Sequence, residues 1–223
     1  MRVNQLRSYM TMITLTKNCI ASRISDNHFN GEFGTHSVTA VNTLVEISRD
    51  ALRSNRQVAY KGFAKLVPKI KKGGRPVRNP KTGKPVVMKE VATVTMPSSQ
   101  PTKKAVNPQN KMNTSELINE LKNRLKDQIR APITDIDKLA EATAEEFISA
   151  LAETETCHVR VEIRGFGVFS AKPREPRSAI NPKTLEKVTT KPGVRKHFKV
   201  SRPFRTELLS DLKKMSKIND GKY

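Results

Sequence analysis

The residues best suited to chemistry in this sequence are cations gathered around a repeated Asn-Pro-Lys-Thr tetrapeptide. The stretch RNPKTGKPV begins at Arg78, and INPKTLEKV begins at Ile180. Lysine and arginine neutralise phosphate groups, and a rigid proline ring at a turn tip can wedge between stacked base pairs. The combination therefore indicates a surface that binds a polyanion. A turn made by Asn-Pro followed by glycine is the simpler interpretation of each tetrapeptide.

The first basic stretch is free of acidic residues. Between Lys61 and Lys89 there are ten Lys or Arg and no Asp or Glu. We expect this stretch to project as a two-stranded hairpin, because it has no apolar face wide enough to pack on a core. A solvated charge run is the alternative, but so many unopposed cations repel one another without an anionic partner. The predicted nucleic-acid contacts here are Lys69, Lys71, Lys72, Arg75, Arg78, Asn79, Pro80, Lys81, Thr82 and Lys84.

The second basic stretch is weaker than the first. Glu175 and Glu186 interrupt it, Ile180 stands where the first copy has Arg78, and Leu185 stands where it has Gly83. Residues 1–110 carry 19 basic against 5 acidic residues, or +14, whereas residues 111–223 carry 23 against 16, or +7. The first half is therefore predicted to be the stronger polyanion binder. The predicted contacts in the second stretch are Arg174, Arg177, Asn181, Pro182, Lys183, Thr184 and Lys187.

The whole chain is strongly basic. Its 42 Lys and Arg against 21 Asp and Glu give a net charge of +21 and a pI near 10.2. Nucleic acid is the first candidate partner, an anionic membrane surface the second and an acidic protein the third. The apolar runs are too short to span a bilayer, and the amino-terminal stretch lacks the apolar region of a signal peptide. We therefore expect a soluble protein without a membrane partner, located in the cytoplasm and nucleoid or in a virion.

Enzymatic chemistry has little support in the sequence. The four histidines are scattered without metal-ligand spacing, and no nucleophile–base arrangement or phosphate-binding loop is apparent. Cys19 and Cys157 fall at non-equivalent places and are expected to be free thiols. We predict neither enzymatic activity nor a cofactor nor a metal site.

The elements that position the basic stretches form a tandem repeat. Gly62-Phe63 corresponds to Gly165-Phe166 at an offset of 103, and the two Asn-Pro pairs correspond at an offset of 102. The copies therefore differ by one residue between these points. Before each Gly-Phe the apolar spacing is helical, and around it apolar and polar residues alternate as in strands, with Val58 and Tyr60 in copy one. The corresponding alternating residues in copy two are Val159, Val161 and Ile163.

Two helices are predicted in each copy. In copy two, Asn113 is the expected N-cap of the first helix, with Glu116 completing a capping box, and the segment RAPITD ends that helix. In copy one, a short first helix is expected around residues 16–24, followed by a loop over residues 25–34. The predicted inward-facing residues are Leu117, Ile118, Leu121 and Leu125 in one helix, Ile136, Leu139, Ala140, Thr143, Phe147 and Leu151 in the next, and Val38, Val41, Val45 and Leu52 in copy one.

The predicted fold class is α+β. Each repeat is expected to contain two helices, a three-stranded sheet with a long basic β-hairpin arm, and a short C-terminal helix. The expected boundaries are an extension over 1–14, repeat one over 15–106, a linker over 107–111, repeat two over 112–215 and a tail over 216–223.

The chain resembles the HU and integration host factor family. The resemblance rests on GFGVF at Gly165–Phe169, on a basic arm with NPKT at its tip, and on MNTSELINELKNRL from Met112, which suggests a gene fusion. It covers most of residues 112–215 and, more loosely, residues 15–106. It implies an intertwined dimer whose arms enter the DNA minor groove, with Pro80 and Pro182 partly intercalated. It also implies that Phe63, Phe166 and Phe169 are core residues near the bases of the arms. Ala64, Ile180 and Leu185 depart from the family pattern.

The function expected from these features is that of an architectural double-stranded DNA-binding protein with little sequence preference. The alternative is a structural subunit of a multiprotein assembly, such as a phage virion ring or connector, whose arms contact phage structural proteins. RNA is a weaker candidate, because the arms lack stacking aromatic residues. The repeats could pair within one chain or between chains of a homo-oligomer, and a linker of about six residues spans about 20 Å, which allows both.

Overall fold

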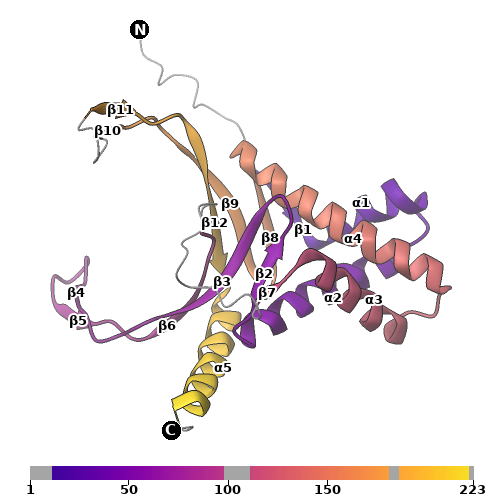
Figure 1. The fold of residues 1–223 in the computed structure, drawn as a ribbon, viewed down its shortest axis with the longest axis horizontal. Coiled ribbons are helices and arrows are strands. Elements are labelled where there is room, and N and C mark those ends of the chain that lie inside the picture. Colours follow the sequence, from indigo (N-terminus) through magenta and orange to yellow (C-terminus); the bar gives the residue numbers. More distant parts are fainter. Residues whose placement is uncertain (1–11, 98–110, 181–185, 221–223) are drawn as a thin grey trace.

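The computed structural model describes residues 12–97, 111–180 and 186–220. Within these residues, five α-helices and two four-stranded sheets form the body, and two thin β-ribbons leave it (Figure 1). The mixed α+β class with two repeats is confirmed. The helices are α1 (Lys17–Phe29), α2 (Gly34–Arg53), α3 (Thr114–Gln128), α4 (Ile133–Glu153) and α5 (Arg202–Asp220), and a 3-10 turn spans Thr154–Thr156.

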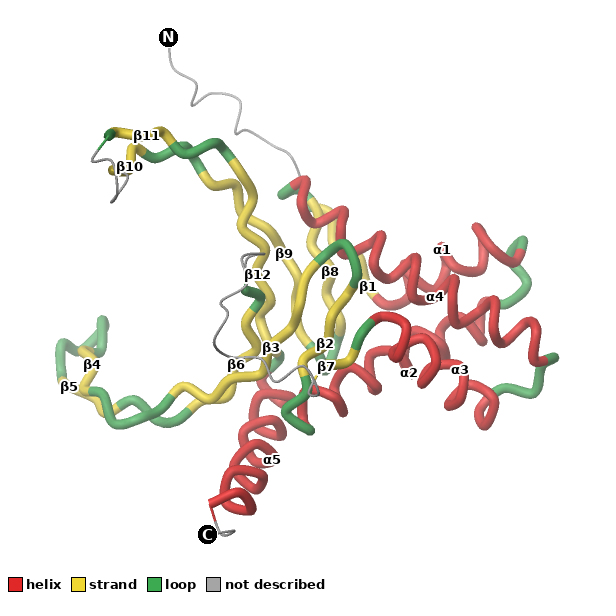
Figure 2. The backbone as a smooth tube through the Cα atoms, viewed as in Figure 1, coloured by secondary structure: helices red, strands yellow, loops and turns green. Residues whose placement is uncertain are grey.

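The strands of the body form two sheets of similar design. The first has the order β6-β3-β2-β7 and the second the order β1-β8-β9-β12. Figure 2 shows α1 to α4 gathered on one side of the strands and the ribbons on the other. The strands of the first sheet are β2 (Gln57–Tyr60), β3 (Ala64–Lys71), β6 (Val91–Thr95) and β7 (Lys111–Met112). Those of the second are β1 (Ile13–Thr16), β8 (Val159–Ile163), β9 (Gly167–Arg174) and β12 (Gly193–Val200).

Each repeat lends its first strand to the sheet of the other repeat. Strand β1 runs parallel to β8 of repeat two, and β7 runs parallel to β2 of repeat one. These strands lie partly in the segments expected to be an extension and a linker. Sequence patterning did not predict them, because the backbone partner of each strand lies far away in the chain.

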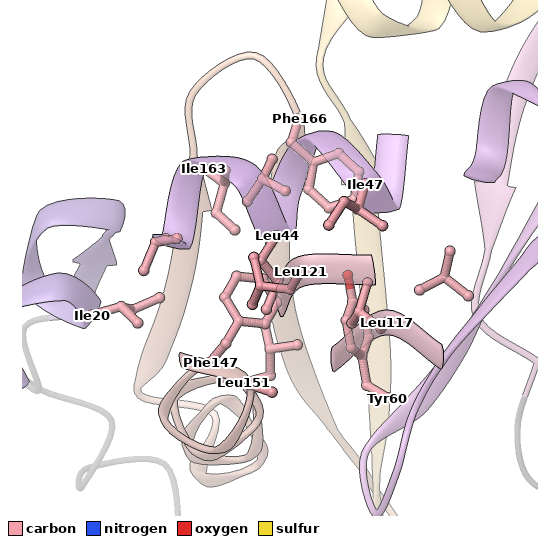
Figure 3. Packing of buried hydrophobic residues seen from close by; sticks show 14 of the residues in the cluster. Ile20, Leu44, Ile47, Tyr60, Leu117, Leu121, Phe147, Leu151, Ile163 and Phe166 are labelled. Atoms are coloured by element: carbon pink, nitrogen blue, oxygen red, sulfur yellow. The ribbon is translucent and has the colours of Figure 1, made fainter. Parts of the chain in front are cut away.

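A single hydrophobic core joins the two repeats. Leu44 and Ile47 from α2, Leu121 from α3 and Phe147 from α4 are all buried in one cluster (Figure 3). The ring centroids of Tyr60 from repeat one and Phe147 from repeat two lie 5.6 Å apart. The repeats are therefore packed against each other within one chain, rather than lying side by side as two separate domains.

The predicted inward-facing residues are mostly correct. All of those predicted on α4 and in β8 are buried or half-buried, as are Leu117, Leu121 and Leu125 on α3. Val38 was predicted to face inward but is 36 % exposed, whereas Ser37 beside it is buried. The first turn of α2 therefore presents Ser37 to the core, and the hydrophobic spacing rule is wrong at this one position, since Val41, Val45 and Leu52 are buried as predicted.

Helix α1 is longer than predicted and shortens the expected loop over residues 25–34. It continues to Phe29 and ends where Asn30 (φ 49°) and Gly31 (φ 87°) adopt left-handed backbone conformations. Its last turn is polar because it faces α4, where Asn27 Nδ2 donates a 2.9 Å hydrogen bond to Glu146. The loop prediction was wrong for residues 25–29, because polar side chains such as Asn27 have partners in the other repeat.

The caps and ends of two other helices also differ from expectation. Asn113 does precede α3, but its side chain makes no cap hydrogen bond to the backbone and instead lies 3.5 Å from Glu116 Oε1. Helix α5 is 19 residues long rather than short, and it runs through residues 216–220, where a tail was expected. The short helix expected near the end of repeat one falls within residues 98–110, which lie outside the described residues.

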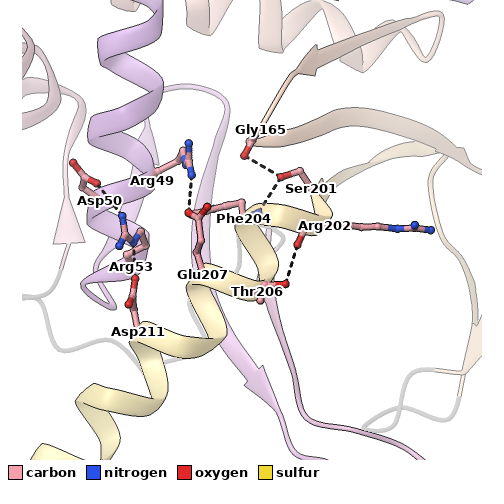
Figure 4. Close-up of polar contacts among 10 residues, drawn as sticks. All are labelled: Arg49, Asp50, Arg53, Gly165, Ser201, Arg202, Phe204, Thr206, Glu207 and Asp211. Carbon is pink, nitrogen blue, oxygen red and sulfur yellow. Dashed lines mark hydrogen bonds and ion pairs between the residues drawn. The ribbon is translucent and has the colours of Figure 1, made fainter.

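Helix α5 crosses from repeat two onto repeat one. Arg49 of α2 donates a 2.7 Å hydrogen bond to Glu207 and lies over the Phe204 ring at 5.1 Å (Figure 4). Arg53 Nε donates a 2.5 Å hydrogen bond to Asp211, and this bond raises the pKa of Arg53. Lys213 pairs with Glu90 at 2.5 Å, next to the outer part of the first ribbon. These contacts anchor the C-terminal helix beside β6.

Candidate nucleic-acid interface

Two ribbons project from the same side of the body and form the candidate interface (Figures 1 and 2). Arm 1 consists of residues 64–95, and arm 2 consists of residues 167–200. The outer part of arm 1 pairs β4 (Pro76–Arg78) with β5 (Pro85–Val87), and that of arm 2 pairs β10 (Ser178–Ile180) with β11 (Lys187–Thr189). The predicted basic hairpins therefore exist as separate outer ribbons.

The inner part of arm 1 corrects one expectation about the basic stretch. Leu66 and Pro68 of β3 and Ala92 and Val94 of β6 are buried, so this part does have an apolar face on the core. Alternation along the strand places Lys65, Lys69 and Lys71 on the opposite, exposed face. Only the part from about Lys72 to Glu90 leaves the body.

The predicted contact residues of arm 1 are accessible. Asn79 is half-buried, and all the others are exposed. None of the arm 1 cations from Lys65 to Lys89 makes an ion pair with an acidic side chain of the described chain. The body differs, because its acids pair with body cations, such as Glu153 with Arg23 and Asp50 with Arg124. Arm 1 thus carries a continuous run of cations that have no acidic partner among the described residues.

The tip of arm 1 is a turn held by its own side chains. The Asn79 side-chain oxygen accepts a 2.9 Å hydrogen bond from Lys81 N, and the Asn79 carbonyl accepts a 2.8 Å bond from Gly83 N. Arg78 Nε donates to the Gly83 carbonyl at 3.1 Å across the turn. Gly83 has φ of 68°, which explains the need for glycine there. Pro80 is left exposed at the end of the ribbon, as a wedge requires.

Arm 2 is described except for its tip. Arg174, Arg177 and Lys187 are exposed on the ribbon, and Ile180 is 62 % exposed beside the tip. Asn181, Pro182, Lys183 and Thr184, all predicted contacts, lie outside the described residues. Their role, like DNA contact by the other predicted residues, stays a prediction.

Further lysines and arginines of the two basic stretches were not among the predicted contacts but are also exposed on these ribbons. These residues are Lys65 and Lys89 on arm 1 and Lys172, Lys191, Arg195 and Lys199 on arm 2.

Lys196 is a ribbon cation with a structural role. Its Nζ donates a 2.6 Å hydrogen bond to the Phe63 carbonyl, lies 2.7 Å from Glu155 and sits 4.5 Å from the Phe63 ring centroid. Phe63, Phe166 and Phe169 are buried near the arm bases as expected, with the Phe63 and Phe169 centroids 6.4 Å apart. Lys196 therefore ties the base of arm 2 to repeat one.

Other kinds of site find no support in the described part of the chain. It contains no group of three or more His, Cys, Asp or Glu side chains arranged to hold a metal ion. None of its helices has the length and apolar character needed to cross a membrane. Both cysteines are free, and a hydrogen bond with the Thr16 side chain lowers the pKa of Cys19.

Comparison with known proteins places this architecture in a family. The sequence model of the family described as "Bacterial DNA-binding protein" matches residues 15–107 and again residues 112–208. Integration host factor subunit beta of Marinomonas sp. (strain MWYL1) is 38 % identical over 109 residues, which cover 49 % of this chain and 98 % of the relative. The same subunit of Aliivibrio fischeri (strain MJ11) is 40 % identical over 94 residues, covering 42 % and 94 %.

A solved structure also matches. The Anabaena HU–DNA cocrystal structure has 26 % identity to this chain and a TM-score of 0.30, and the match covers 42 % of this chain and 92 % of that one. Two successive family matches, together spanning most of the chain, agree with the two pseudo-equivalent halves of the fold. The chain therefore belongs to the bacterial DNA-binding protein family, as a tandem protein of the HU and integration host factor type.

Proposed function

We propose that this chain is a non-enzymatic architectural protein that binds double-stranded DNA through its two arms, enters the minor groove and bends the duplex. The observation that carries the proposal is the pair of ribbons on one side of a shared body, with unpaired cations along arm 1 and exposed Pro80 at its tip. Phosphate neutralisation would supply most of the affinity and make it sensitive to salt, with little dependence on sequence.

The two arms of the proposed complex come from one chain. A protein with a single repeat of this design would need two subunits to present two arms, whereas here the repeats share a core and exchange strands β1 and β7. We infer that the DNA-binding unit is an intramolecular pseudodimer. Its site of action would be the nucleoid.

Replacing Pro80 with alanine is expected to reduce DNA bending. A wedge that partly unstacks one base step kinks the duplex by about 20–90°. Bending brings the two ends of a doubly labelled duplex together, so we expect the complex with P80A to show lower end-to-end FRET than the complex with the wild type. The loss of affinity should be modest, because the cations remain. Pro85→Ala is the matched control, since Pro85 is exposed on the same ribbon but lies outside the tip turn. Equal bending by wild type, P80A and P182A would rule out the wedge.

The altered tip sequence of repeat two favours a second candidate function, in which arm 2 contacts a neighbouring protein. Ile180 is an exposed apolar side chain at the position of Arg78. An assembly subunit of this kind, for instance in a virion, would form closed rings without nucleic acid in negative-stain images. A small monodisperse particle that bends DNA would support the architectural function instead.

A further inference from the structure

The two arms differ in construction where each outer ribbon leaves the body. In arm 1, residues 72–75 separate β3 from β4 on one strand, and residues 88–90 separate β5 from β6 on the other, which is four against three. In arm 2 the corresponding segments are residues 175–177 and 190–192, three against three. Arm 1 therefore has one extra residue at its bend. This residue accounts for the change of offset from 103 to 102 between the repeats.

The extra residue of arm 1 lies in a glycine pair. Gly74 has φ of 87°, and its amide donates a 2.9 Å hydrogen bond to the Met88 carbonyl. A Cβ on Gly73 would lie 2.7 Å from the Met88 oxygen and 2.9 Å from the Glu90 nitrogen. A side chain at Gly73 would therefore require a backbone shift, whereas one at Gly74 would have room but would be strained by the positive φ. An unequal residue count with glycine in the left-handed region forms a bulge, which bends the ribbon and interrupts its ladder.

The bend of arm 2 is built from residues that restrict the backbone. Pro176 and Pro192 lie on opposite strands of the bend, and each fixes its own φ. Between them, Thr190 N donates to the Arg177 carbonyl at 2.9 Å, and Arg177 N donates to Thr190 Oγ1 at 2.8 Å. Arm 1 has the equivalent backbone bond, from Met88 N to the Arg75 carbonyl at 2.9 Å. The bends therefore differ in the Thr190 side-chain bond and in carrying prolines in arm 2 against a glycine pair in arm 1.

We propose that Gly73 and Gly74 are positioning residues that hinge the outer ribbon of arm 1, whereas Pro176, Thr190 and Pro192 hold the outer ribbon of arm 2 in a preset direction. Arm 2 would then offer a fixed ribbon to the duplex, and arm 1, which carries Pro80 and the denser charge, would close onto the DNA. The part of this inference that concerns DNA rests on the proposed function. The difference in stiffness does not.

Backbone order parameters from ¹⁵N relaxation on the free protein test the difference directly. We expect them to fall from about 0.85, the value of rigid backbone, in β3 and β6 to below about 0.6 in β4 and β5, with the step at residues 72–75. In arm 2, values in β10 and β11 should stay close to those in β9 and β12. Equal steps in the two arms, or a step in arm 2 alone, would overturn the proposal.

Two variants exchange the properties of the bends. Deleting Gly74 gives three residues on each strand and should remove most of the step in arm 1. The double substitution Pro176→Gly and Pro192→Gly should create a step in arm 2. Pro85→Gly is the control, because it adds a glycine to the arm 1 ribbon outside the bend, and it should leave the step at residues 72–75 in place. Retention of the wild-type pattern by both bend variants would contradict the assignment of these residues.

Bending FRET on the same variants separates the two proposals. The Gly74 deletion should lower DNA affinity and bending, whereas the arm 2 variant should change them less. Failure of the wild-type protein to bend DNA, with the order-parameter step present, would reject the DNA function and keep the hinge. Normal bending by the Gly74 deletion, with the step abolished, would show that the hinge is not needed for closing on DNA.

Discussion

Replacing Arg75, Arg78, Lys81 and Lys84 together with glutamine should abolish most of the DNA affinity of arm 1. Each phosphate contact contributes about 0.9 to the slope of log K against log salt, so the loss of four contacts should flatten that slope by about 3.6. If the wild type neutralises about eight phosphates, its slope is about −7. Fluorescence anisotropy titrations of a labelled duplex over a series of salt concentrations measure both quantities.

Arm 2 supplies the matched comparison for this charge variant. Arg177 and Lys183 correspond to Arg75 and Lys81, whereas Ile180 and Glu186 stand at the positions of Arg78 and Lys84. The double change R177Q and K183Q should therefore flatten the slope by only about 1.8, and Ile180→Arg should steepen it by about 0.9. A slope that is the same for the arm 1 variant and the wild type would show that the ribbon does not contact phosphates.

Replacing Phe147 with alanine should destabilise the whole chain by about 3–5 kcal/mol, because the cavity forms in a fully buried cluster. A loss of this size is a large part of the roughly 5–15 kcal/mol by which domains are stable. Phe147 belongs to repeat two, but its ring meets Tyr60 of repeat one, whose pKa is raised by burial in the same core. Urea unfolding followed by far-UV circular dichroism measures the change.

The shared core predicts a second effect of the Phe147 variant, on hydrogen exchange. Amides of α2 in repeat one should lose hydrogen-exchange protection together with those of α4, because both helices pack on the same cluster. Ile133→Ala is the control, since Ile133 is 63 % exposed on the same helix, and it should change stability by less than about 0.5 kcal/mol. Wild-type protection in α2 beside a weakened α4 would mean that the repeats unfold independently.

The amino-acid sequence by itself determined the features that depend on near neighbours in the chain. The tandem repeat, the acid-free ribbon, the turn at Pro80 and the buried stripe of α4 all follow from the order and spacing of adjacent residues. The weaker charge of arm 2 and its altered tip follow in the same way. These features were enough to predict the α+β class and the candidate interface, because a strand, a turn or an amphipathic helix carries its own pattern.

Only the tertiary structure decided the features that join distant residues. The exchange of β1 and β7, the polar last turn of α1 against Glu146 and the anchoring of α5 on Arg49 and Arg53 all pair groups from different repeats. No local pattern reports such partners, since backbone pairing and ion pairs depend on proximity in space. The change of offset between the repeats was visible in the sequence, but its meaning as a glycine bulge came from the strand register around Gly73 and Gly74.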